Sequence, residues 1–259
     1  GALMTRIVSS ELFKLRTTRT FYALVFSAVG IVLLITVAAA LATDFTPDPG
    51  DFGDDPPRPE DLLGIGSFAQ VFALIIGILA VTTEFRHGTI TSSVLAVPDR
   101  VRLTLGKFGA GLVVGLLLGV VCVGVSTLLV VALLSARGVS TDFASGEVAY
   151  SILGGVLGVV LYTGLGVGVG AVVRNQVGAI VGSLVWLFVL ESLLGIIPTV
   201  GDWVAEYGPG GAGSALGDAS AERGSHTLDQ LPAGLLLLGY CLVFLLAGIH
   251  LMRRRDISA

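Results

Sequence analysis

Six long runs of apolar residues dominate this sequence, and they constrain the fold more than any other feature. Each holds about eighteen or more residues with almost no charge, which is what an α-helix needs to cross the ~30 Å hydrocarbon core of a membrane. With 54% hydrophobic and only 13% charged residues, the chain also lies outside the composition of soluble globular domains. The runs cover residues of about 20–43, 62–83, 108–135, 148–173, 177–197 and 232–252.

These runs predict an all-α integral membrane protein with six transmembrane helices in a single transmembrane domain, residues 4–259. Residues 1–3, ahead of Met4, are interpreted as a cloning remnant. The first run also imitates a secretory signal peptide, but it is too long for one and five further spans follow it. We therefore interpret the first run as a retained helix, with cleavage as the alternative.

The segment of about residues 5–17 predicts an amphipathic helix that lies in the plane of the membrane surface. Glu11 falls on its apolar side, which is an unfavourable place for a carboxylate unless a cation such as Lys107 or Arg102 meets it. A surface helix with one misplaced acid is the alternative. The apolar stripe consists of Ile7, Val8, Leu12 and Leu15.

The distribution of lysine and arginine predicts the orientation, because cytoplasmic segments near span ends carry the positive excess. An N-terminus inside the cell places twelve of the fifteen cations on the cytoplasmic side. Both termini are therefore expected to be cytoplasmic. The twelve are Arg6, Lys14, Arg16, Arg19, Arg86, Arg100, Arg102, Lys107, Arg174, Arg253, Arg254 and Arg255.

The sequence gives almost no evidence of catalytic or cofactor-binding motifs. Lys107 is followed by Phe108, so the chain has no Walker loop for ATP, and no serine, histidine and acid group together as in a hydrolase. His226 and Asp229 lack further ligands for a metal. We expect neither an enzyme, nor a metal site, nor a nucleic-acid-binding protein. Glycines at steps of four in the third span, with six more in the fourth, instead predict close helix packing.

A polar segment, residues 84–107, connects the second and third spans on the predicted cytoplasmic side. Gly88 ends the second helix, and the following residues can form about two helical turns before Pro98 stops them. Ile90, Val94 and Val97 would lie on one face of this helix. A partner protein can bind such a helix. A solvated loop whose cations follow the positive-inside rule is the alternative, and charge and periodicity alone leave both open.

Two motifs in this chain resemble those of the ABC type-2 exporter permeases, also called type V exporters. One motif lies in the segment between the second and third spans and comprises Glu84, Phe85, Arg86, Gly88, Thr89, Pro98, Arg100 and Lys107. The other lies in the N-terminal helix, which is similar to the elbow helix of that family, and comprises Glu11, Lys14, Arg16 and Arg19.

The resemblance implies a bacterial plasma-membrane permease whose Glu84 to Pro98 region, including Val94, forms a coupling helix seated in a separate ATPase. It further implies two ATPase copies, a second permease chain of the same or a different kind, and alternating access driven by ATP. ATP and Mg²⁺ would bind the ATPase, with no cofactor on this chain. Short re-entrant helices are implied after the fifth span, about residues 197–207.

The function predicted from these features is efflux of an apolar or amphiphilic substrate, such as a drug, lipid or peptide. Few aromatic rings are available to stack against a sugar polymer. Two alternatives stay open. One is a secondary transporter driven by an ion gradient, and the other is a membrane sensor or immunity protein that transports nothing.

Among aspartate, glutamate, lysine and arginine, Glu191 is the one residue inside any predicted span. Fourteen residues from the inner edge at 1.5 Å each place it about 21 Å up, in the outer third of the membrane near an outer gate. Such a carboxylate needs a partner. Unpaired N–H groups of a re-entrant helix after Pro198 are one candidate, and a cation or amine on the cargo is the other.

Overall fold

The protein is an array of helices in the computed structural model, which describes residues 2–43, 59–91, 95, 97, 99–139, 146–217 and 228–254. No strand occurs among these residues. The helices up to the fourth span are α1 (Ala2–Thr17), α2 (Arg19–Ala42), η1 (Pro59–Phe68), α3 (Ala69–Arg86), α5 (Arg100–Ala136) and α6 (Gly146–Val173). The remaining helices are α7 (Gln176–Val185), η2 (Trp186–Leu190), α8 (Glu191–Gly195), α9 (Val200–Tyr207), α10 (Pro209–Gly217) and α11 (Gln230–Arg254).

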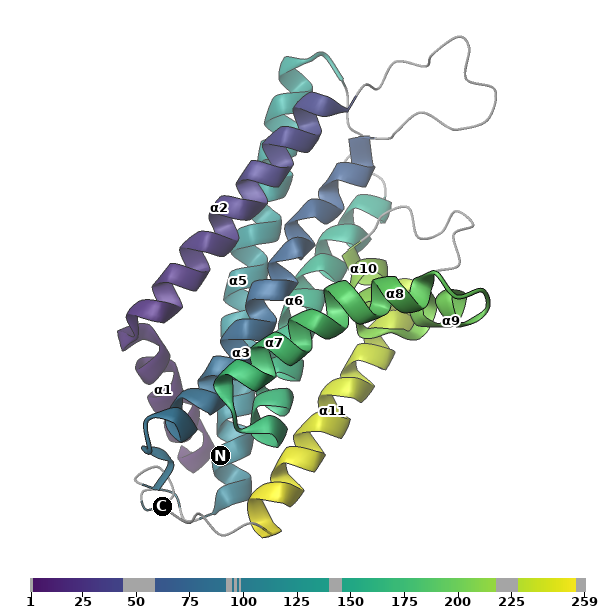
Figure 1. The fold of residues 1–259 in the computed structure, drawn as a ribbon. Coiled ribbons are helices and arrows are strands. Elements are labelled where there is room, and N and C mark those ends of the chain that lie inside the picture. The colour runs from purple at the N-terminus through teal and green to yellow at the C-terminus, as the bar shows by residue number, and fades with distance from the viewer. Residues whose placement is uncertain are drawn as a thin grey trace.

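Six of these segments are long and apolar enough to cross a membrane, and they confirm the six predicted spans. The short helix α1 precedes them and forms an angle with α2 at the lower end of the bundle in Figure 1. The end of α11 lies at the same end of the bundle as α1 (Figure 1). The spans cover Arg19–Ala42, Leu62–Arg86, Arg100–Ala136, Val148–Val173, Gln176–Gly195 and Gln230–Met252.

Helix α6 is the central element of the bundle and packs against α3, α5 and α11. Its glycines explain how it accommodates three neighbours. A Cβ on Gly166 would lie 2.2 Å from the carbonyl oxygen of Leu74 in α3, and one on Gly77 in α3 would lie 2.2 Å from that of Thr163 in α6. The two backbones therefore touch where a side chain would hold them apart, which is how membrane helices gain dispersion contacts.

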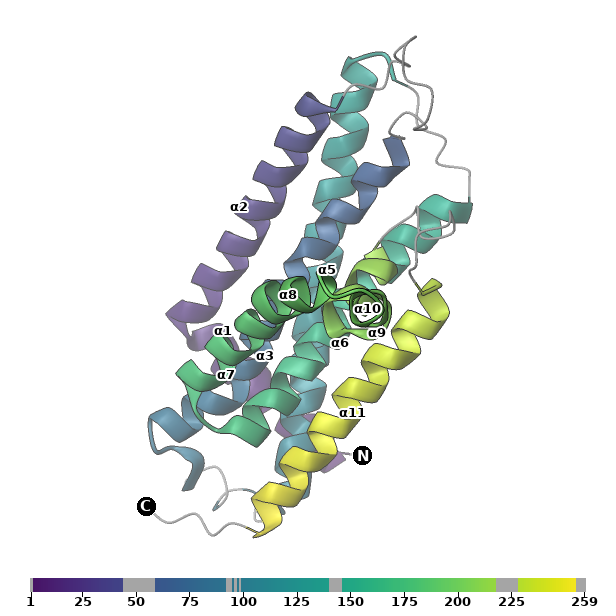
Figure 2. The same ribbon diagram turned by 45° about the vertical axis from the view of Figure 1, so that its right-hand side comes forward.

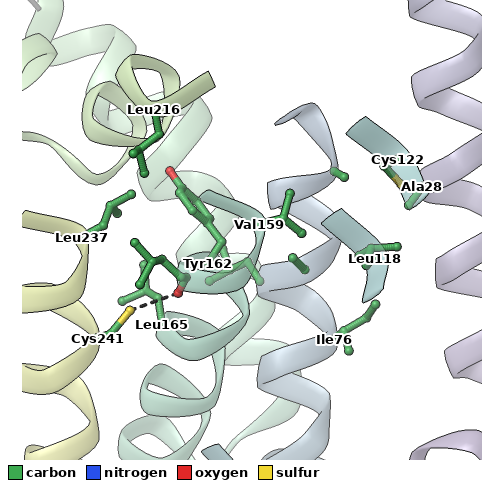
Figure 3. Packing of buried hydrophobic residues seen from close by; sticks show 14 of the residues in the cluster. Ala28, Ile76, Leu118, Cys122, Val159, Tyr162, Leu165, Leu216, Leu237 and Cys241 are labelled. Carbon is green, nitrogen blue, oxygen red and sulfur yellow. Dashed lines mark hydrogen bonds between the residues drawn. The ribbon is translucent and has the colours of Figure 1, made fainter. Parts of the chain in front are cut away.

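The core of the bundle lies where α6 meets α3, α5, α10 and α11 (Figure 3). Tyr162 lies between Leu165 and Leu216 there, and the Cys241 thiol donates to the carbonyl oxygen of Leu161 at 3.0 Å. Cys122 lies on the far side, against α2. Both cysteines are buried and unbridged, as small apolar side chains are.

Helix α5 begins earlier than the apolar run indicated. Its 37 residues start at Arg100, about two turns before the predicted start of the third span at residue 108. The Asp99 side chain caps the helix by accepting from the N–H groups of Val101 and Arg102. The predicted loop therefore ends at Asp99, and Lys107 lies on a regular helix rather than in a connection.

The fifth span is a continuous helix that contains a π-helical segment, whereas the fourth span is α-helical throughout. A π-helical segment, η2, follows α7, and its i→i+5 pairing places residues five apart on one face. The chain then turns through Thr199, whose φ is 72°, into the short helices α9 and α10. These two helices continue to Gly217, ten residues beyond the re-entrant segment that the family resemblance implied. Figures 1 and 2 show them folded back against the side of the bundle.

Candidate functional site

Four charged side chains meet at the end of the bundle where α1, α3 and α5 come together. Lys107 Nζ donates to Glu11 Oε2 at 2.7 Å and lies 2.8 Å from Glu84 Oε1. Lys14 Nζ donates to the same two acids, to Glu11 Oε1 at 2.7 Å and to Glu84 Oε1 at 3.0 Å. We call these four residues the charged cluster. Its two acids and two bases tie the elbow helix to the second and third spans.

Because the charged cluster is largely buried, its members depend on one another for charge compensation. The side chain of Lys107 is 1% exposed and that of Glu11 is 6% exposed, whereas Lys14 is 49% exposed. Because an unpaired ion at such depth costs several kcal/mol, each buried member requires the others. Burial alone lowers the pKa of Lys14, but its hydrogen bonds to Glu11 and Glu84 outweigh burial and raise that pKa. Lys14 is therefore a cation at neutral pH.

The structure settles which cation meets the misplaced acid of the elbow helix. Lys107 pairs with Glu11, whereas Arg102 pairs with Asp99 at 3.0 Å on the exposed start of α5. The other two elbow cations that the resemblance singled out, Arg16 and Arg19, are exposed.

The turn that follows α3 explains two further motif residues. Thr89 N–H donates to the carbonyl oxygen of Glu84 at 3.0 Å, and Gly88 N–H donates to that of Phe85 at 3.4 Å. This pair of bonds is the Schellman motif, which needs a residue with positive φ at the position of Gly88. Gly88 has a φ of 67°. The predicted helix break at Gly88 is therefore confirmed.

Phe85 and Arg86 bind the turn between α6 and α7. The Arg174 guanidinium lies 5.4 Å from the centroid of the Phe85 ring, within the range of a cation–π interaction. Arg86 Nη1 donates to Gln176 Oε1 at 3.3 Å. Arg174 itself has a φ of 57°, a conformation that is uncommon for residues other than glycine. The end of the second span is thus fastened to the start of the fifth.

The rest of the connection is only partly described. Ile90, Thr91 and Leu95 are helical, Ile90 is buried, and the Leu95 side chain is 78% exposed. Val94 and Pro98 lie outside the described residues. At the far end of the connection, Arg100 Nη1 donates to the carbonyl oxygen of Met252 at 2.7 Å, in the last turn of α11. A cation there is favourable for the helix dipole.

Glu191 meets uncharged donors rather than a cation. Its Oε1 accepts from the Trp186 indole N–H at 2.9 Å and from the Gly210 N–H at 3.1 Å. Trp186 reaches it because the π-helical segment places residues five apart on the same face. Gly210 is the second residue of α10, so the carboxylate lies at the N-terminus of that helix. The donor belongs to the second short helix and not to the turn directly after Pro198.

The depth of Glu191 differs from the position calculated for an upright helix. The backbone next to Gly210 is held by side chains near the middle of two spans: Tyr162 donates to the Pro209 carbonyl at 2.6 Å, and Tyr240 to that of Tyr207 at 2.8 Å. Glu191 is therefore level with the middle of α6 and α11. The calculation assumed a fifth span along the bundle axis, whereas α7 and α8 cross the bundle obliquely (Figures 1 and 2).

Several residues of these sites were not singled out from the sequence. Arg174 and Gln176 are polar residues between the fourth and fifth apolar runs, and this position could have drawn attention to them. Nothing in the sequence pairs them with Phe85 and Arg86. Trp186 lies five residues before Glu191, a spacing that has meaning only once a π-helix is known. Among the described residues, no group of three histidine, cysteine or acidic side chains is placed to hold a metal.

Comparison with known families agrees with this geometry. The sequence model of the family described as "ABC-2 family transporter protein" matches residues 7–190, which include the whole charged cluster. The chain therefore belongs to the ABC-2 transporter family and is a multi-pass membrane component of a transporter, not itself a catalyst. Members of this family associate in general with an ABC ATPase. No curated protein matches the chain.

Proposed function

We propose that this chain is the transmembrane permease subunit of an ATP-driven exporter, which moves an apolar or amphiphilic substrate such as a drug, lipid or peptide out of the cell. The charged cluster carries this proposal. It joins the start of the connection after α3 to both the elbow helix and α5, so that a force on the connection moves three elements together. A separate ATPase binds ATP and Mg²⁺ and supplies that force.

The motif residues act as a junction in this proposal rather than as a contact surface. Glu84 and Lys107 are buried in the charged cluster, and Phe85 and Arg86 hold the turn before α7. Among the described residues of the connection, Leu95 has an exposed apolar side chain, which the connection offers to a partner. A cleft in the ATPase that buries Leu95 would gain about 1.5–3 kcal/mol from that side chain.

The orientation and the assembly follow from the same proposal. The ATPase lies in the cytoplasm, so the end of the bundle that holds the charged cluster and both termini is cytoplasmic, in agreement with the distribution of cations. The fifth span, Gln176–Gly195, is the least covered of the six candidate spans, with 6% of its most apolar window buried in this chain. We place a second permease chain, of the same or a different kind, against this span.

The test is purification of the tagged permease from its native membrane. A Walker-motif ATPase should co-purify, and its ATPase activity should rise with the permease in liposomes. Leu95→Asp should abolish both effects by placing a charge in the docking cleft, while Leu95→Met should retain them. Insertion and elution volume should be unchanged in both variants. Full co-purification and stimulation with Leu95→Asp would refute the docking role.

Transport driven by an ion gradient is a second candidate, and the depth of Glu191 favours it. An acid level with the middle of the bundle is where proton-coupled transporters place their titrating group. Proteoliposomes that lack ATP separate the two functions. Uptake driven by an imposed pH gradient, and lost in Glu191→Gln, would select the second candidate over the first.

A further inference from the structure

A groove of about 470 Å³ opens between the elbow helix and α2 on one side and α3 on the other. Its floor is formed by two buried members of the charged cluster, Glu11 and Glu84, and the half-exposed Lys14 lines its solvent-exposed end. The residue that begins α7, Gln176, closes one edge. The groove is therefore a space shared by four elements at the end of the bundle where the proposed ATPase acts.

The lining of the groove changes from apolar to polar along its length. Its inner wall consists of Phe21 and Leu24 from α2 and of Ile76 and Leu79 from α3. Its mouth is exposed and carries hydroxyl, cationic and imidazole groups, from Thr18, Thr20, Arg86, His87 and Thr89. This order matches the order of groups in a membrane lipid, from acyl chain to headgroup.

The charge at the mouth of the groove determines whether an anionic or a cationic lipid headgroup binds there. Both carboxylates at the floor are bound by lysines, so the charged cluster as a whole is neutral. Beyond it, the exposed Arg86 lines the mouth of the groove. The mouth therefore carries a net positive charge with several hydrogen-bond donors. A phosphate group fits both features.

We propose that this groove binds an anionic phospholipid of the bilayer, with an acyl chain along Phe21, Leu24 and Leu79 and the phosphate near Lys14 and Arg86. A lipid enters without leaving its leaflet, because the mouth is level with the amphipathic elbow helix, which lies at the depth of the headgroups. Once bound, the lipid joins α2 to α3. The site does not depend on which substrate the transporter moves.

Quenching of a tryptophan by brominated lipids tests the site. Phe21→Trp places a reporter on the inner wall, and Val113→Trp places a matched reporter on the exposed side of α5, away from the groove. Each is reconstituted in phosphatidylcholine vesicles that contain brominated phosphatidylglycerol or brominated phosphatidylcholine. The signal of the parent protein, with its two native tryptophans, is subtracted as the blank.

Quenching at Phe21→Trp should show that the groove binds phosphatidylglycerol in preference to phosphatidylcholine, by about fivefold for each cation at the headgroup. Arg86→Gln in the same background should remove about fivefold of that preference. High salt should weaken it by screening. The α5 reporter should show no preference. Equal quenching by both lipids at Phe21→Trp, or an equal preference at Val113→Trp, would overturn the proposal.

Discussion

Glu84 and Glu191 are both carboxylates on apolar helices, yet this chain satisfies them in different ways. Glu84 lies within 3.0 Å of two lysine ammonium groups. Among the described residues, Glu191 receives uncharged N–H donors, one from an indole and one from the backbone. The difference follows from depth. Near the membrane surface, lysines can reach a buried acid from neighbouring helix ends, whereas in the middle of the bundle a second charge would itself be costly.

The two carboxylates also lie in regions of different rigidity. Glu84 is held among α1, α3 and α5, at the end of the second span, of which 56% of the most apolar window is buried. Glu191 lies on the fifth span, where that share is 6%. A segment with so few internal contacts can shift with a small change in free energy. We infer that the charged cluster keeps α1, α3 and α5 fixed relative to one another, so that they move as one unit, and we call this unit the fixed side. The region around Glu191 is the moving side, which shifts relative to that unit.

Removal of Lys107 should have the largest effect. Lys107→Met leaves two buried carboxylates with a half-exposed lysine as their shared cation, and breaking a buried pair in this way costs about 3–5 kcal/mol. The thermal unfolding midpoint in detergent should fall markedly. The double variant Lys107→Met with Glu84→Gln restores neutrality and should recover part of the loss. A single variant as stable as the parent would contradict the description of the cluster as the fixed side.

Removal of the Glu191 side chain should have a smaller effect. Glu191→Leu leaves the Gly210 and Trp186 N–H groups unpaired, at a cost of about 1–3 kcal/mol. Glu191→Gln keeps an acceptor and should retain most of the stability and of the transport. Unfolding midpoints and export assays measure both. Equal destabilisation by leucine and glutamine would show that the charge, not the hydrogen bonds, is required.

The same pair of variants decides between structure and cargo at this position. If Glu191 holds α10, glutamine is tolerated for every substrate. A glutamine variant that is stable but loses export of cationic cargo alone would assign the carboxylate to substrate binding instead.

The sequence was sufficient for the spans and for the need of Glu11 for a cation, because both follow from periodicity. It left Lys107 and Arg102 open as that cation and did not indicate Lys14. An apolar run fixes a transmembrane helix, and an acid on an apolar stripe requires a cation from a neighbour. The start of α5 was missed because Arg100 and Arg102 were interpreted as loop residues, although Asp99 caps a helix there. The bond from Trp186 to Glu191 depends on a π-helical segment, and the oblique course of the fifth span depends on tertiary packing. Neither feature has a periodic signature.

The smallest effect is expected at Lys14, the exposed member of the charged cluster. Its side chain is 49% exposed, so solvent screens its ion pairs, and Lys14→Gln should cost at most about 1 kcal/mol.

The effect of Lys14→Gln should also depend on pH. Burial lowers the pKa of Lys14, but its hydrogen bonds to Glu11 and Glu84 outweigh burial and raise that pKa above the ordinary value of 10.5. A raised lysine pKa stabilises the fold below the unfolded value and loses that contribution as pH rises through the folded value. The difference in unfolding midpoint between the parent and Lys14→Gln should therefore be constant at neutral pH and disappear only above about pH 10.5. A loss as large as that of Lys107→Met would mean that the exposed Lys14 holds the two acids in place as much as the buried Lys107 does.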